Sequence, residues 1–169
     1  MADLLNVDWM LTLNHLLLMA IAYLLAFPIG FDREEQGPRI GLRTFPLVAV
    51  VSCGFMLVGR AVIDSPGEQG RVLQGIVTGI GFIGGGAILK DDSRVIGTAT
   101  AASIWNCGAI GVAVAYHHLE IAIALSALNF FTLRYMGRLV RSVTGEPVVE
   151  DGQTAKPVEV RESDNKKSP

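Results

Sequence analysis

Hydrophobic and polar residues follow one another in long blocks along this chain. Five apolar runs of about 17 to 20 residues are separated by short charged segments. At about 1.5 Å per residue, a helix of this length crosses roughly 30 Å of hydrocarbon. The runs are apolar on every side, whereas helices of a soluble bundle carry a polar face. The pattern predicts an all-α, polytopic membrane bundle of about five transmembrane helices, at residues 11–29, 46–62, 72–89, 97–116 and 119–136.

Composition agrees with a membrane protein. Half of the 169 residues are hydrophobic, and the net charge of −2 gives no basic surface for nucleic acid. Cys53 and Cys107 each lie inside an apolar run, without the spacing of a disulfide framework or a zinc site. We therefore expect both cysteines to be small core residues.

The basic residues predict an orientation. With five crossings, twelve of the 14 lysines and arginines fall on one side, and only Arg60 and Arg71 fall on the other. Because positive charge is retained in the cytoplasm, the N-terminus is expected outside and the C-terminus inside. Arg60 and Arg134 lie near run ends, where their long side chains reach the headgroups.

The last part of the chain differs in composition from the rest. It is rich in charge and proline and has no aromatic residue. We expect residues 1–141 to form the membrane domain and residues 142–169 to be a disordered cytoplasmic tail.

The third run contains a literal GxGxxG, at Gly79, Gly81 and Gly84. A dinucleotide loop also needs a preceding strand and an acidic residue about twenty positions later, and neither is present in the sequence pattern. No nucleotide and no other cofactor is expected. Small residues four apart instead let membrane helices approach closely, which makes the third run a candidate central helix. The alternative is that consecutive glycines break this helix and line a polar cavity. The residues concerned are Gly75, Gly79, Gly81, Gly84, Gly85 and Gly86, with Thr98 on a similar small face of the fourth run.

Several charged residues flank the runs on the expected cytoplasmic side. Asp32, Arg33 and Glu34 follow the first run, and Arg43 and Thr44 precede the second. An ordinary solvated loop explains them, but the loop can also fold back so that a carboxylate pairs with Arg43. Asp91 emerges on the same side, and carboxylate oxygens suit a hard divalent cation. Asp32, Glu34 and Asp91 are therefore the candidate metal ligands.

The fourth run contains Trp105 and Asn106 at mid-membrane depth. An amide at this depth needs a partner on another helix. We expect Asn106 to face the interior of the bundle.

Three blocks of sequence carry a family resemblance: GFDREEQGPRIGLRT, then GIGFIGGGAILKD, then VIGTATAASIWNCGAIG. In this order they resemble the membrane domain of the MgtC/SapB family of bacterial inner-membrane proteins. The resemblance covers about residues 10–140. The family's acidic-Arg-Glu motif falls on Asp32 to Glu34, and its GLRT on Gly41 to Thr44. Its glycine block falls on Gly79 to Gly86, and its small-residue and Trp segment on Gly97 to Trp105.

The chain departs from the family pattern at three points. Phe45 stands after GLRT, Asn106 follows the Trp, and the chain is expected to lack the soluble C-terminal domain of the virulence-related members.

The resemblance implies a plasma-membrane protein tied to magnesium limitation and acid stress. For some members it implies contact with ATP synthase within the membrane. Two functions remain open. One is a modulator that docks on another membrane protein or on its own copy, and the other is a small ion transporter or channel subunit, related to magnesium. No catalytic constellation is visible, so no enzyme is expected.

Overall fold

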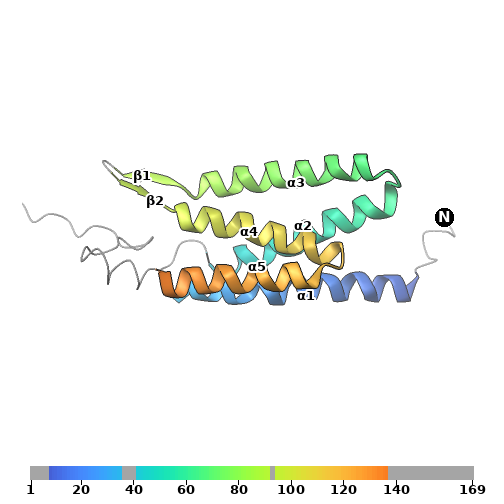
Figure 1. The fold of residues 1–169 in the computed structure, drawn as a ribbon, viewed down its shortest axis with the longest axis horizontal. Helices are drawn as coiled ribbons and strands as arrows, with labels where there is room; N and C mark the ends of the chain where they lie inside the picture. Colours follow the sequence, from blue (N-terminus) through green and yellow to red (C-terminus); the bar gives the residue numbers. More distant parts are fainter. Residues whose placement is uncertain (1–7, 36–40, 92–93, 137–169) are drawn as a thin grey trace, which may run out of the picture.

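The computed structural model describes residues 8–35, 41–91 and 94–136, and all structural statements below concern these residues. They form a bundle of antiparallel helices (Figure 1). The elements are α1 (Trp9–Glu35), α2 (Thr44–Val62), α3 (Pro66–Gly86), β1 (Leu89–Asp91), β2 (Arg94–Ile96), α4 (Thr98–Ala115), α5 (Leu119–Phe131) and the π-helical turn η2 (Thr132–Met136). The expected all-α bundle is confirmed, and a small β-hairpin is added to it.

The centre of the bundle is α4. It contacts α1, α2, α3 and α5, and most of its residues are buried. The expectation that the third run is central is wrong, because α3 lies at the side of the bundle and packs mainly on α4. The close approach of α2 to α4 depends on Gly111 of α4. A Cβ there would meet the carbonyl oxygen of Ala49 and lie 2.9 Å from the amide nitrogen of Cys53, so α2 can pack on α4 only with glycine at this position.

The length and composition of four helices suit a membrane crossing: α1, α2, α4, and α5 continued by η2. The helix α3 has 21 residues and runs alongside them in the opposite direction to α2 and α4. Its many glycines and its polar first half lower its hydropathy. It begins six residues before the predicted start, with Pro66 in the first turn, where a missing N–H costs nothing.

Between α3 and α4 the structure has an antiparallel hairpin where a charged loop was expected. Leu89 pairs with Ile96, Lys90 with Val95 and Asp91 with Arg94. Gly97 joins β2 to α4 with a φ of +89°, and a Cβ at Gly97 would collide with the carbonyl of Ala87. Only glycine fits this junction without strain.

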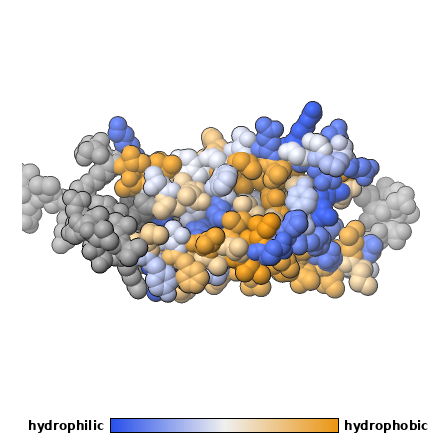
Figure 2. Space-filling view, in the orientation of Figure 1, coloured by the Kyte–Doolittle hydropathy of each residue, from blue (hydrophilic) through white to orange (hydrophobic). Residues whose placement is uncertain are grey.

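The outer surface of the bundle is apolar. Large side chains such as Leu24, Phe55 and Leu128 are each more than half exposed, while Cys53 and Cys107 are fully buried, as predicted. Hydrophobic residues occupy much of the middle of the face shown in Figure 2, and hydrophilic residues gather near the α2–α3 connection. Many exposed apolar side chains of this kind are what a lipid-facing surface requires.

Candidate functional site

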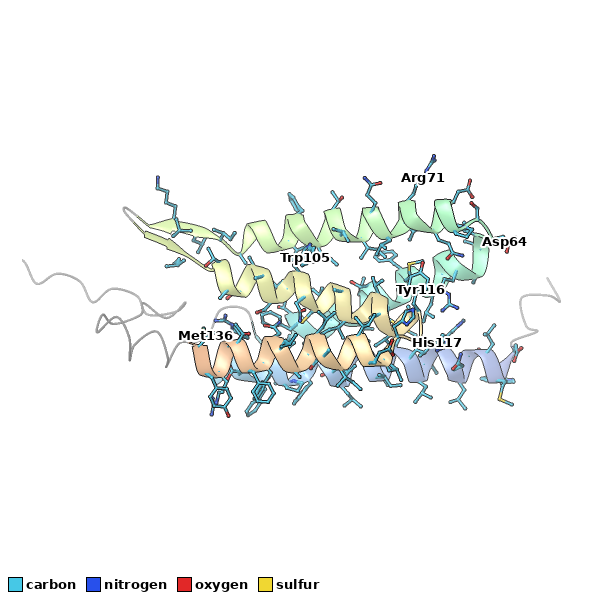
Figure 3. All side chains as sticks on the ribbon, viewed as in Figure 1. Asp64, Arg71, Trp105, Tyr116, His117 and Met136 are labelled. Carbon is cyan, nitrogen blue, oxygen red and sulfur yellow. The ribbon has the colours of Figure 1, made fainter. Side chains whose placement is uncertain are left out.

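The bundle has two ends that differ in chemistry. We call the end with the β1–β2 hairpin, the start of α2 and the end of η2 the hairpin end. The opposite end, with Asp64, Tyr116 and His117, is called the Tyr116 end (Figure 3). The N-terminus of α1 lies at the Tyr116 end and the last residue of η2, Met136, at the hairpin end. This arrangement agrees with an odd number of crossings, while the cytoplasmic location of the hairpin end stays a prediction.

An ion pair with one buried partner lies at the hairpin end. Nη1 of Arg134, in η2, is 3.3 Å from Oδ1 of Asp32, near the end of α1. The Asp32 side chain is 1% exposed and that of Arg134 is 41% exposed. Of the carboxylates that were predicted to pair with Arg43, Asp32 thus pairs with Arg134 instead, and the side chain of Glu34 lies outside the described residues. Because η2 continues α5 alongside α1, it carries Arg134 to Asp32, whereas Arg43 is exposed at the start of α2.

The GLRT segment forms the beginning of α2. The amide of Thr44 donates to the carbonyl of Gly41 at 3.0 Å, and the next residue, Phe45, is completely buried. The departure from the family pattern at position 45 is thus a core residue. GLRT positions the first turn of α2, with Arg43 and Thr44 at its start.

The candidate metal ligands are only partly described. Arg33 is 7% exposed beside Asp32, and the side chains of Glu34 and Asp91 lie outside the described residues. Within the described part of the chain, no three His, Cys, Asp or Glu residues form a group that could hold a metal ion. The structure therefore leaves the three predicted ligands without a demonstrated site.

Single polar side chains link the helices at membrane depth. The Asn106 amide donates to the carbonyl of Leu125 in α5 at 3.3 Å, which confirms the expected interhelical partner. Trp105 is instead half-exposed, and Thr98 is exposed at the start of α4.

Two residues of α5 that sequence reasoning missed make similar links. Ser126 donates to the carbonyl of Leu25 in α1 at 2.6 Å, and Oδ1 of Asn129 accepts from the hydroxyl of Ser103 in α4 at 3.1 Å. Their signal in the sequence is an isolated polar residue in an apolar run. Such residues are expected to find a partner across helices.

Another polar cluster ties three helices together at the Tyr116 end. Arg60 donates to the carbonyl of Ala115 and lies over the ring of Tyr116, with its guanidinium carbon 5.4 Å from the ring centroid. The hydroxyl of Tyr116 donates to Gln69 at 3.4 Å, and the amide of Gln69 donates to the carbonyl of Ile63 at 2.7 Å. A cation at the carboxyl end of a helix is favourable, so Arg60 stabilises α4 while it holds α2 nearby.

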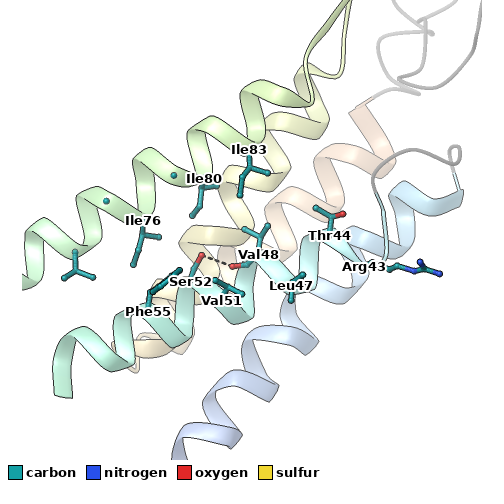
Figure 4. A pocket seen from close by; sticks show the side chains of 13 residues that line it. Arg43, Thr44, Leu47, Val48, Val51, Ser52, Phe55, Ile76, Ile80 and Ile83 are labelled. Atoms are coloured by element: carbon teal, nitrogen blue, oxygen red, sulfur yellow. Dashed lines mark hydrogen bonds between the residues drawn. The ribbon is translucent and has the colours of Figure 1, made fainter. Parts of the chain in front are cut away.

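Between α2 and α3 lies a groove of about 610 Å³ (Figure 4). Ile76, Ile80 and Ile83 of α3 face Val48, Val51 and Phe55 of α2 across it. Gly75 and Gly79 form part of its α3 wall, and a Cβ at either would meet nothing within 4 Å. These two glycines therefore leave space, whereas the sequence predicted close helix packing at them.

The opposite side of α3 is also open. Gln74, Thr78, Gly81 and Gly85 share one face at the spacing of a helical repeat, and all four are exposed. We call these four residues the outer face of α3. A Cβ added at Gly81, Gly85 or Gly86 meets nothing within 4 Å, while one at Gly84 would lie 3.2 Å from the carbonyl oxygen of Ala101. The predicted close packing within the chain is thus confirmed for Gly84 and wrong for Gly81 and Gly85. Gly86 ends α3, so the three consecutive glycines terminate the helix and do not interrupt it.

Comparison with known proteins identifies the family. The model of the MgtC family matches residues 19–142, which include the ion pair, the groove and the outer face of α3. The chain belongs to the MgtC family. It is a multi-pass bacterial membrane protein.

Curated MgtC relatives are longer than this chain. Protein MgtC of Salmonella typhimurium strain LT2 is 31% identical over 144 residues, which are 85% of this chain and 62% of the relative. "Putative magnesium transporter YhiD" of Escherichia coli K12 is 31% identical over 136 residues, 76% of this chain and 63% of the relative. Protein MgtC of Brucella abortus strain 2308 is 42% identical over 94 residues, 56% of this chain and 39% of the relative. The chain thus spans about three-fifths of the first two relatives, and no solved structure matches it.

Proposed function

We propose that this chain is a non-catalytic membrane protein that modulates another membrane protein by docking the outer face of α3 against a helix of that partner. The observation that carries the proposal is the exposure of Gln74, Thr78, Gly81 and Gly85 on one face of α3. Gly81 and Gly85 are four residues apart and have open space where a Cβ would lie. Such a face allows the backbone of a second helix to come close.

The physics of a bilayer favours a helix over lipid on this face. Lipid tails gain little from contact with glycine, because there is no side chain to pack against. Gln74 lies more than two turns into α3, and its amide has hydrogen-bonding groups that hydrocarbon cannot satisfy. A partner helix offers both close packing and a polar group for the amide. ATP synthase, implied by the family resemblance, and a second copy of this chain are the candidate partners.

The physiological setting is proposed from the relatives. One curated relative carries the name of a magnesium transporter and others carry the name MgtC. We propose that the chain acts in adaptation to magnesium limitation or acid stress. This setting accords with a role that changes the activity of another membrane protein.

A small magnesium-related ion transporter or channel subunit is the second candidate function. It is favoured by the buried carboxylate of Asp32 in its pair with Arg134, since ionisable groups within the membrane often mark ion pathways. Arg134 is half-exposed at the hairpin end, however, so the pair also fits a structural link between α1 and α5 near the headgroups. For this reason we place the transporter second.

Two leucine substitutions on α3 test the docking proposal. Gly81→Leu places a bulky side chain on the outer face, and Gly79→Leu places the same side chain in the groove on the other side of the helix. Gly81→Leu is expected to abolish co-purification of the partner from membranes of magnesium-limited cells, and to abolish the growth benefit. Gly79→Leu is expected to retain both. Equal loss in the two variants, or retention in both, contradicts docking through the outer face.

Ion flux in liposomes separates the two functions. The purified wild-type chain alone is expected to give no magnesium flux above empty liposomes. Flux that disappears in Asp32→Asn would establish the transporter and overturn the modulator.

A further inference from the structure

We propose that the groove between α2 and α3 is a binding site for one acyl chain of an anionic phospholipid, whose headgroup is bound by Arg43. This inference is independent of partner docking, since it concerns the other side of α3. It rests on how polarity is distributed along the groove, on its shape, and on the glycines in its wall.

The groove has a polar end and an apolar body. Arg43 and Thr44 line it at the hairpin end, where α2 begins. The Arg43 side chain is exposed and extends past this end of the groove, away from α3, as Figure 4 shows. Beyond these two residues the lining is aliphatic and aromatic apart from Ser52, whose hydroxyl donates to the carbonyl of Val48 in its own helix at 2.7 Å. The body of the groove therefore offers no unsatisfied hydroxyl. A cation at one end of a hydrocarbon-lined groove matches an amphiphile with a negative headgroup.

The charge of the surrounding end supports an anionic headgroup. Lys90, on β1, is exposed at the same end as Arg43. This is also the end that the distribution of basic residues predicts to face the cytoplasm, where anionic lipids attract arginine and lysine. Arg71 lies at the other end of α3, near the Tyr116 end, and does not line the groove.

The shape of the groove favours an acyl chain over a partner helix. At the Tyr116 end α2 and α3 are joined by a short connection and tied by the hydrogen bond from Gln69 to Ile63. An α-helix with its side chains is about 10–12 Å across, so it would have to force these two helices apart. An acyl chain is thinner and flexible. Gly75 and Gly79 leave room for it, because a larger side chain at either position would project into the groove.

Lipid-dependent melting of the purified full chain tests the site. After removal of bound lipid, the melting temperature is measured against phosphatidylglycerol and phosphatidylcholine with identical acyl chains. A ligand that binds the folded state raises the melting temperature, and at equal ligand concentration the rise is larger for the tighter ligand. Phosphatidylglycerol is expected to bind about fivefold more tightly, the effect of one basic residue near an anionic lipid. Arg43→Gln should remove the difference, while the control Arg71→Gln should keep it.

The substitutions Gly79→Leu and Gly81→Leu test the apolar body of the groove. Gly79→Leu should weaken the response to both lipids, and Gly81→Leu should leave both unchanged. If Gly79→Leu does not fold, Gly79→Ala serves instead, because its Cβ meets no atom within 4 Å and only narrows the groove. Soluble glycerol phosphate, which has a headgroup but no chain, should not raise the melting temperature.

Four outcomes would overturn the proposal. They are an equal response to the two lipids in the wild type, a preference that survives Arg43→Gln, stabilisation by glycerol phosphate, and an unchanged lipid response when the groove is filled at Gly79. Native mass spectrometry gives a further check. One bound lipid per chain is expected. A lipid-free dimer that forms in the wild type but not in Gly79→Leu would show instead that a second copy occupies the groove. Loss of partner docking in Gly81→Leu, by contrast, leaves this proposal intact.

Discussion

Replacing Gly111 by alanine is expected to destabilise the bundle far more than the same change at most other glycines. Gly111 is in α4 at its crossing with α2. A Cβ there would meet the carbonyl oxygen of Ala49 and lie 3.0 Å from its carbonyl carbon and 2.9 Å from the amide nitrogen of Cys53. These are backbone atoms, so they cannot rotate away as a side chain would. The two helices must separate by part of a methyl diameter along their shared interface.

The magnitude follows from the cost of overpacking. Forcing an extra methyl group into a packed core typically costs about 1–3 kcal/mol. Alanine also has a higher helix propensity than glycine by up to about 1 kcal/mol, and this gain must be subtracted. Gly81→Ala supplies the matched control, because it has the same propensity gain and its Cβ meets nothing within 4 Å. We expect Gly111→Ala to be about 1–3 kcal/mol less stable than Gly81→Ala.

Denaturant titration in detergent micelles measures this difference. Gly108→Ala adds an intermediate case, since its Cβ would meet the Cδ1 of Ile80, the movable end of a side chain. The expected order of stability is Gly81→Ala, then Gly108→Ala, then Gly111→Ala. If Gly111→Ala is as stable as Gly81→Ala, the close crossing of α2 and α4 is incorrect.

Three further predictions concern the ends of the bundle. Arg134→Gln is expected to lower the free energy of unfolding by about 1–2 kcal/mol, because it leaves the buried Asp32 without this partner while Arg134 itself is partly exposed. Adding Asp32→Asn should lower it by less than the sum of the two single effects. Additive effects in this double-mutant cycle would show that the pair does not interact. Tyr116→Phe should lose about 0.5–1.5 kcal/mol of unfolding free energy with the hydrogen bond to Gln69. Arg60→Met should lose more, because it removes both the charged donor to Ala115 and the cation over the Tyr116 ring. A reversed order in the denaturant titration would contradict the described cluster. The orientation is tested in a background with both cysteines replaced by alanine. Asp64→Cys and His117→Cys should react with an impermeant maleimide from outside intact cells, and Lys90→Cys should react only after the cells are opened. Labelling of all three from one side would refute the predicted orientation.

Helix number and lipid exposure could be predicted from the sequence because they depend on local quantities. An apolar run of sufficient length becomes a membrane helix whatever its neighbours are. The same reasoning placed Asn106 against another helix, since an amide in hydrocarbon requires a partner. Arg60, which was expected to reach the headgroups, instead donates to the carbonyl of Ala115 in α4.

The arrangement of the helices could not be predicted in this way. The third run has the most glycines, yet α4 is central, because a glycine permits close packing without requiring it. Gly111 is in contact with the α2 backbone, whereas Gly81 faces open space. In the sequence both are simply glycines within an apolar run, so this difference could not be predicted. The partner of Asp32 was missed for a related reason. Arg134 lies 102 residues away and reaches Asp32 only through the π-helical turn after α5.

Photocrosslinking from α3 in native membranes tests the docking of its outer face most directly. A benzophenone amino acid is placed at Phe82, which is 86% exposed at the edge of the outer face, next to Gly81 and one turn before Gly85. As a control it is placed at Leu128 of α5, which is 66% exposed. Phe82 is expected to give a discrete protein adduct, either with a partner or with a second copy, and Gly81→Leu should abolish it. Leu128 should give lipid adducts only. If Phe82 also yields only lipid adducts in magnesium-limited cells, the outer face of α3 is lipid-facing and the proposed docking is wrong.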